Sequence, residues 1–194
     1  MSAILRRVRR SGRQAGFTLT ELLVVVLLLG VVGSVVGSGL VSSMRADRKT
    51  RARVSVTGDL TKGVDRMTKQ IRVAAPVVDF SATSLTVETY RNGLRYRYAY
   101  TYNVAAKTVS ETLSTFATAN AVSPSSQTTQ TLLRNVSNGS ATPMFKYYDR
   151  NGTAATQIKD IARVELTLVE KPQGDAQGPI SFSTSVFLRN YREM

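Results

Sequence analysis

The residue that most needs a chemical explanation is Glu21, which lies near the start of a long apolar run. Between Phe17 and Met44 the chain has no Lys or Arg, and Glu21 is the only charged residue. A stretch of about 20 apolar residues is long enough to cross the hydrocarbon core of a bilayer. A charge inside such a stretch costs about 2.5–3.5 kcal/mol on insertion scales, so this carboxylate calls for a partner and a function.

A cationic partner would arise if the chain were cut between Gly16 and Phe17. Phe17 would then carry a free amine, and Glu21 would lie four residues downstream, which is the same face of a helix. The amine and the carboxylate could pair within one chain. Alternatively, Glu21 of one subunit could bind the amine of its neighbour, and the membrane helix would then serve to assemble subunits.

The composition closes the common routes to catalysis and metal binding. The chain has neither Cys nor His, so Ser–His and Cys–His nucleophile pairs are impossible, as are thiolate or imidazole metal sites. Asp149 and Asn151 could begin a calcium loop, but the acids that would complete it are missing, and we predict a turn there. We therefore predict no enzyme, no cofactor and no metal site.

The N-terminal region has a strong family resemblance. The run Gly16-Phe17-Thr18-Leu19-Thr20-Glu21-Leu22-Leu23-Val24 closely resembles the class III signal of type IV pilins and type II secretion pseudopilins. In that family a short basic leader ends in Gly, Phe follows, Glu is the fifth mature residue, and a hydrophobic helix comes next. The resemblance implies that prepilin peptidase cuts after Gly16 and methylates the amine of Phe17. It also implies that Glu21 guides assembly with other pilin or pseudopilin subunits.

Two simpler interpretations of the same region remain open. One is a secretory signal peptide with its apolar core at 22–36 and a cut near Ser38 or Gly39, as its basic head and apolar core would suggest. An acidic residue at the start of the core does not fit that pattern. The other is a plain signal anchor, which would not need a carboxylate.

We divide the chain into a leader (1–16), a hydrophobic transmembrane and assembly helix (17–44), an amphipathic continuation (45–75) and a β-rich globular head (76–194). The leader holds five Arg and no acid, so its removal lowers the formal charge from +13 to +8. By the positive-inside rule, the leader is cytoplasmic and the head lies outside the cytoplasm. We expect a single-pass protein of the bacterial inner or cytoplasmic membrane that later enters a pilus or pseudopilus.

The helical pattern continues beyond the membrane segment. Apolar residues recur at spacings of three and four, and Pro76 supplies a stop. We interpret this stripe as packing under a sheet, with a kink plausible at Gly58 or Gly63. The stripe consists of Val56, Leu60, Val64, Met67, Ile71 and Ala74.

After Pro76 the period changes to two, which predicts strands. Asn92-Gly93 predicts a hairpin turn, and 114–130, rich in Ser, Thr, Ala and Gln, is predicted to be a loop. The strands are expected at 84–90, 94–104, 108–113, 144–149, 161–169 and 180–188.

The predicted strand at 94–104 alternates Tyr with polar residues. We interpret the Tyr face as core, with Arg91, Arg95 and Arg97 nearby but on the opposite face. Aromatic and cationic residues together can bind single-stranded nucleic acid, and the basic charge also suits phosphate contacts. The alternative function is therefore a DNA-binding minor pilin of a competence pilus, with DNA as a partner.

The whole layout predicts an α+β, pilin-like fold, in which the long helix packs against antiparallel β-sheet. It looks most like J-type minor pseudopilins or W-type minor pilins, on the residues of 59–74, 147–152 and 164–168. A disulfide-bounded C-terminal loop, as in a typical major pilin, is impossible without Cys. We therefore expect a minor pilin or pseudopilin.

Overall fold

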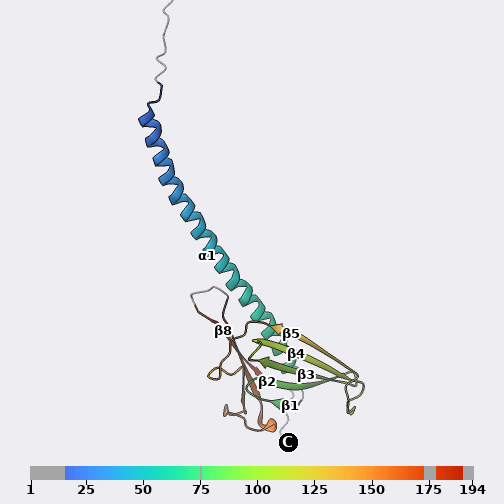
Figure 1. The fold of residues 1–194 in the computed structure, drawn as a ribbon. Helices are drawn as coiled ribbons and strands as arrows, with labels where there is room; N and C mark the ends of the chain where they lie inside the picture. The colour runs from blue at the N-terminus through green and yellow to red at the C-terminus, as the bar shows by residue number, and fades with distance from the viewer. Residues whose placement is uncertain (1–15, 75, 173–177, 190–194) are drawn as a thin grey trace, which may run out of the picture. The chain divides into compact units, whose positions relative to one another are not determined.

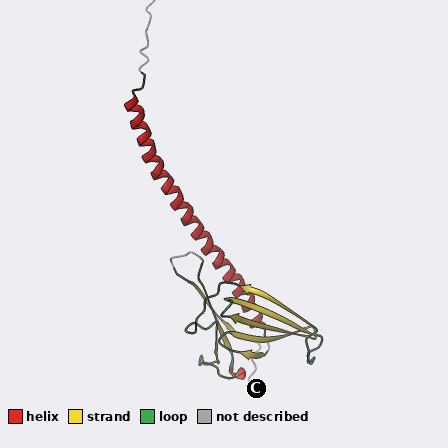
Figure 2. Cartoon of the chain, in the orientation of Figure 1, coloured by secondary structure: helices red, strands yellow, loops and turns green. Residues whose placement is uncertain are grey.

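The computed structural model describes residues 16–74, 76–172 and 178–189. These residues form one long helix, α1 (Leu19–Val73), a short 3-10 helix, η1 (Ile158–Asp160), and two antiparallel sheets (Figures 1 and 2). The predicted α+β class is confirmed. The five-stranded sheet has the order β1 (Val77–Phe80), β2 (Ser84–Arg91), β3 (Leu94–Asn103), β4 (Thr108–Phe116), β5 (Ser126–Leu133), and the three-stranded sheet has the order β6 (Phe145–Tyr148), β7 (Arg163–Glu170), β8 (Ile180–Phe187).

The chain divides into two compact units between Asp47 and Arg48. The first unit contains the apolar part of α1 and is described with the candidate site below. The second unit contains the rest of α1 and both sheets, and it holds the hydrophobic core.

The predicted apolar stripe of the helix forms one side of that core. Helix α1 runs unbroken through Gly58 and Gly63. Gly63 has a packing role, because a Cβ added there would meet Leu133 Cδ2 at only 2.9 Å. The missing side chain thus lets the end of β5 approach the helix closely. The buried residues of α1 are Leu60, Gly63, Val64, Met67 and Ile71.

The first hairpin of the five-stranded sheet forms as the sequence predicts. Asn92 and Gly93 both have positive φ, 53° and 76°, which is the requirement of a two-residue type I′ turn. The resulting register places Tyr100 between Leu85 and Glu111. Tyr100 and Tyr102 are buried, as expected, whereas Tyr96 and Tyr98 are half-buried.

The predicted boundaries of the loop at 114–130 are both wrong. Strand β4 extends to Phe116, and β5 begins at Ser126. The run of β5 is polar on both faces, so it has no alternation of apolar and polar residues to reveal a strand. Its pairing with β4 makes it a strand, and Thr suits the pleated surface. The short strand β1 was also missed, because four residues are too few to establish a period.

The three-stranded sheet closes the core from another direction. Val164, Leu166 and Leu168 of β7 are fully buried, as the alternation predicts. The Tyr147 hydroxyl donates to the carbonyl oxygens of Ser81 and Ser84, at 2.9 and 2.8 Å. These two bonds join β6 to the turn between β1 and β2, and so link the two sheets.

A buried ion pair ties α1 to the five-stranded sheet. Arg66 Nη2 donates to Glu111 Oε1 at 2.7 Å, and Arg66 Nε lies 3.1 and 3.2 Å from the two carboxylate oxygens. Gln130 Nε2 of β5 donates to the same carboxylate at 2.8 Å. Burial disfavours the charged form of Glu111, but these hydrogen bonds outweigh that cost and hold the pKa of Glu111 below its ordinary value.

Replacing Arg66 with Ala should therefore destabilise the second unit strongly. The Glu111 side chain is 1% exposed and Arg66 is 49% exposed, so the variant leaves a buried carboxylate without its main partner. We expect a loss of about 2–3 kcal/mol in the free energy of unfolding at pH 7, measured by urea denaturation of the full chain in detergent micelles with tyrosine fluorescence.

The matched control is Lys69→Ala on the same helix. Lys69 pairs with Asp65 at 2.7 Å, but both side chains are exposed, so we expect a change within about 0.5 kcal/mol. The stabilisation from ionised Glu111 is present above its unfolded pKa and is lost as pH falls through its lowered folded pKa. The difference in the free energy of unfolding between wild type and Arg66→Ala should therefore become smaller in acid. Equal effects of the two variants would contradict this account.

Candidate functional site

Helix α1 begins with a side-chain cap that the sequence analysis missed. The carbonyl oxygen of Thr18 accepts from the backbone N–H groups of Glu21 and Leu22, both at 3.1 Å. Its Oγ1 also accepts from the Glu21 N–H, at 3.2 Å. Thr18 is thus the N-cap and Glu21 lies in the first turn, a spacing of Thr and Glu that marks a helix start in sequence. A carboxylate is favourable there because the N-terminal end of a helix is partly positive.

Phe17 lies outside helix α1, which begins at Leu19. In the uncut chain Phe17 precedes the N-cap and is 78% exposed, so the helical spacing that would place it on the face of Glu21 does not apply. Among the residues that the structure describes, no ion pair reaches the Glu21 carboxylate.

The apolar half of α1 has no protein partner in the described chain. Every side chain from 19 to 51 is exposed, and the helix is long and apolar enough to cross a membrane. The hydroxyl groups of Ser34 and Ser38 donate to the carbonyl oxygens of Val31 and Val35, at 2.7 and 2.9 Å. These polar groups are therefore satisfied within the helix, as an apolar environment requires.

The charges that flank the apolar half are nearly balanced. The leader holds five Arg, and five cations with only one acid, Asp47, follow the apolar run. A comparison of cation counts on the two sides therefore gives little preference for either orientation. The predicted extracytoplasmic head then depends on the leader signal itself. The cations after the run are Arg45, Arg48, Lys49, Arg51 and Arg53.

The candidate DNA-binding cations are largely committed to other contacts. Arg97 Nη2 lies 2.7 Å from Glu88 Oε1, and the guanidinium of Arg95 lies 3.9 Å from the ring centroid of Phe116. Arg95 also donates to the carbonyl oxygen of Ala121 at 2.5 Å. The register confirms that Arg95 and Arg97 lie on the face opposite the Tyr residues of β3. The prediction is wrong for Arg91, which pairs with Leu94 and so lies on the Tyr face. Glu88 and Phe116 are nevertheless buried on the Arg face, which was expected to be merely polar.

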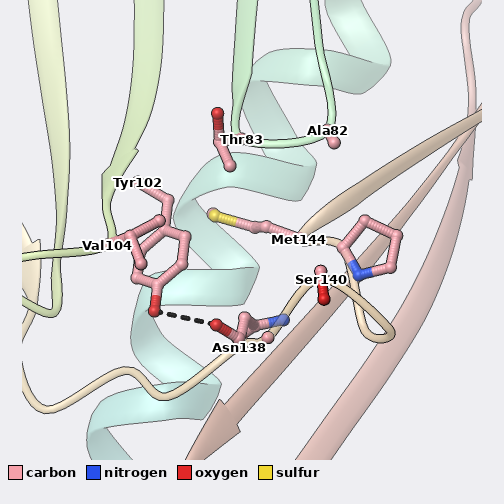
Figure 3. A pocket seen from close by; sticks show the side chains of 9 residues that line it. Ala82, Thr83, Tyr102, Val104, Asn138, Ser140 and Met144 are labelled. Atoms are coloured by element: carbon pink, nitrogen blue, oxygen red, sulfur yellow. Dashed lines mark hydrogen bonds between the residues drawn. The ribbon is translucent and has the colours of Figure 1, made fainter.

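A cavity of about 290 Å³ opens beside Tyr102 (Figure 3). Two of its polar side chains, Tyr102 and Asn138, are already bonded. The Tyr102 hydroxyl lies 3.1 and 3.2 Å from the carbonyl oxygens of Val136 and Asn138, to which it donates. The Asn138 side chain donates to the carbonyl oxygens of Thr142 and Thr167. None of the described residues that line it carries a charged side chain. The lining residues are Ala82, Thr83, Tyr102, Val104, Asn138, Gly139, Ser140, Pro143 and Met144.

The predicted turn at Asp149 is confirmed. Asp149 Oδ1 accepts from the backbone N–H groups of Asn151 and Thr153, both at 2.8 Å, so its carboxylate closes the turn. Within 16–74, 76–172 and 178–189, no three acidic side chains gather in a way that could hold a metal ion.

Comparison with known proteins supports the N-terminal signal. Residues 11–37 match the family described as "Prokaryotic N-terminal methylation motif". No curated protein matches the chain. The chain thus carries a type IV pilin-like class III signal, and the match covers the Gly16–Phe17 junction, Thr18 and Glu21 within its range.

The capping role of Thr18 leads to a prediction. Replacing Thr18 with Ala removes the side-chain acceptor for the Glu21 N–H and should cost about 1 kcal/mol of local helix stability. Hydrogen exchange of the Glu21 amide, measured by NMR on the chain in detergent micelles, should become about fivefold faster. Thr20→Ala is the control, because its hydroxyl contacts only that of Thr18. Equally fast exchange in both variants would argue against the cap.

Proposed function

We propose that the chain is a minor pilin or pseudopilin, a structural subunit of a type IV pilus or type II secretion-like filament. The single observation that carries the proposal is the methylation motif at 11–37, whose second part forms the start of an apolar helix with exposed side chains. Prepilin peptidase cuts between Gly16 and Phe17 and methylates the new amine of Phe17. The motif points to a structural subunit rather than an enzyme.

The apolar helix holds the subunit in the membrane before assembly. Lipid covers its exposed side chains, and the flanking cations suit the headgroup regions. After the cut, the Phe17 amine is a cation at the start of the helix. Glu21 of a neighbouring subunit binds this amine, because an unpaired charge in either position would be costly in an apolar setting.

Helices then replace lipid as the cover of the apolar surface. Buried apolar area contributes about 25 cal/mol per Å² to transfer from water, so the helix cannot leave the membrane without such a cover. The sheets remain outside the bundle as the head of the subunit.

We do not extend the proposal to DNA binding. Arg97 and Arg95 lie close to the buried carboxylate of Glu88, at 2.7 and 3.7 Å, which offsets part of their charge. Phosphate binding depends on clustered, uncompensated cations. The pairing with Glu88 therefore weakens the case for a DNA-binding minor pilin.

The cut is tested by the mass and the N-terminal residue of the protein from membranes of its own host. We expect a mature chain that begins at methylated Phe17. Gly16→Leu should leave the leader attached and Arg10→Lys should be cut normally, since only the first variant changes the junction. A wild-type chain that begins near Ser38, or at Met1, would overturn the proposal.

The role of Glu21 is tested by Glu21→Gln, which keeps the size of the side chain and removes its charge. We expect normal cleavage but a reduction of about tenfold or more in the amount of subunit recovered in sheared filaments, because the amine of the neighbour loses its counter-ion. Ser34→Ala is the control within the same helix. Wild-type amounts of Glu21→Gln in filaments would refute the pairing.

A further inference from the structure

The two sheets have four edge strands, and two of these are protected. Strands β1 and β6 have only four residues each. Strand β1 carries a bulge between Val77 and Asp79, and the outer edge of β6 is bonded to other segments. There the Phe145 N–H donates to the Ala82 carbonyl oxygen, at 3.1 Å, and the Tyr147 carbonyl oxygen accepts from the Ala155 N–H, at 2.9 Å. Short length, bulges and bonded edges are the devices that keep sheets from pairing with other chains.

The other two edge strands, β5 and β8, are twice as long. The pairing of β5 has one irregularity, at its C-terminal end, where Thr131 and Leu133 pair with the neighbouring residues Ser110 and Val109. Each has eight residues, with no charged residue and no Pro. Among the described residues, no further backbone hydrogen bond joins the outer edge of β5 or of β8 to another segment. At about 3.3 Å per residue, β8 therefore presents about 26 Å of extended backbone and the regular part of β5, residues 126–131, about 20 Å, whose outward N–H and C=O groups can pair with a strand. Figure 1 shows β5 as the last strand of its sheet.

The side chains next to these two edges match. On the five-stranded sheet the hydroxyl groups of Thr129 and Thr112 lie 2.9 Å apart, and on the three-stranded sheet those of Ser183 and Thr167 lie 3.0 Å apart. Each edge strand thus carries one cross-strand hydroxyl pair, a kind of pair that stabilises adjacent strands and that forms a row when a further strand adds a hydroxyl group. Thr129 and Ser183 are exposed and free to continue such a row with a new neighbour.

We infer that the outer edge of β5 in one molecule pairs with the outer edge of β8 in a second copy of this chain. Pairing of unlike edges leaves one free β5 and one free β8 at the ends of any complex, so it continues into an open chain of heads. A symmetric pair of two β5 edges would instead close a dimer. The choice of unlike edges rests on the proposed function, because a filament needs contacts that do not close.

The absence of native Cys allows a direct test by disulfide cross-linking. Single Cys residues replace the exposed outer-face residues of β5 (Gln127, Thr129, Thr131) and of β8 (Ser181, Ser183, Ser185) in separate full-length chains. Populations are mixed in detergent micelles, oxidised and resolved by non-reducing electrophoresis. We expect cross-linked dimers only in mixtures with one Cys on each strand, and only for those pairs that share one register, because a disulfide needs Cβ atoms about 3.5–4.5 Å apart.

Two controls limit the interpretation. Thr101 lies on the same face of the five-stranded sheet as Thr129, but on the interior strand β3. The variant Thr101→Cys should therefore give no dimer with any β8 variant. Gln127→Lys with Thr131→Lys, added to Thr129→Cys, places charges beside the edge and should abolish the cross-link while the circular dichroism spectrum stays unchanged.

Three outcomes would overturn the inference: no dimer in any mixture, dimers without a preferred register, or dimers from a β5 variant alone. The last result would show symmetric pairing. The N-terminal mass of the protein reports processing independently, so failure of edge pairing and failure of the proposed function are separate results.

Discussion

The arrangement of the second unit depends on one buried carboxylate. Glu111 lies on the core face of the five-stranded sheet, where a charge is tolerated only with partners. Arg66 supplies the cation from α1 and Gln130 supplies a donor from β5, so one side chain joins the helix to two strands. Because the pair is directional, it sets the rotation of the helix over the sheet, which apolar packing alone would leave less defined. Gly63 adds the close approach of Leu133 at the same end of β5.

Helix α1 joins two environments without a break. Its second part has an apolar stripe that packs in the core, whereas its first part is apolar all round and its side chains are exposed. Such a surface needs lipid or other helices as its cover. Glu21 at the first turn is the only charged residue between Phe17 and Met44, and an apolar cover does not satisfy a charge. The proposed subunit role follows from that requirement together with the methylation motif.

The face of the sheet that carries Arg95 and Arg97 shows how a pattern of residue types can mislead. In sequence these cations beside aromatic residues suggest a nucleic-acid surface. In the structure Arg97 pairs with Glu88, and the guanidinium of Arg95 lies over the ring of Phe116. These cations therefore bind groups of their own chain, and Arg95 also donates to the carbonyl oxygen of Ala121. The outer edges of β5 and β8 offer a more distinctive surface, since they are uncharged and, within the described part of the chain, form no further backbone hydrogen bond.

The sequence by itself determined the N-terminal signal, the long helix and most of the strands. Those features arise from local order and period: the run from Gly16 to Glu21, the spacing of apolar residues in α1, and the turn at Asn92. It could not determine what depends on partners distant in the chain. The ion pair of Arg66 and Glu111 joins residues 45 positions apart, and β5 has no apolar period, so only pairing with β4 makes it a strand. Which edges are covered was likewise decided by tertiary structure, because an edge is defined by the absence of a neighbour, and no local pattern records that.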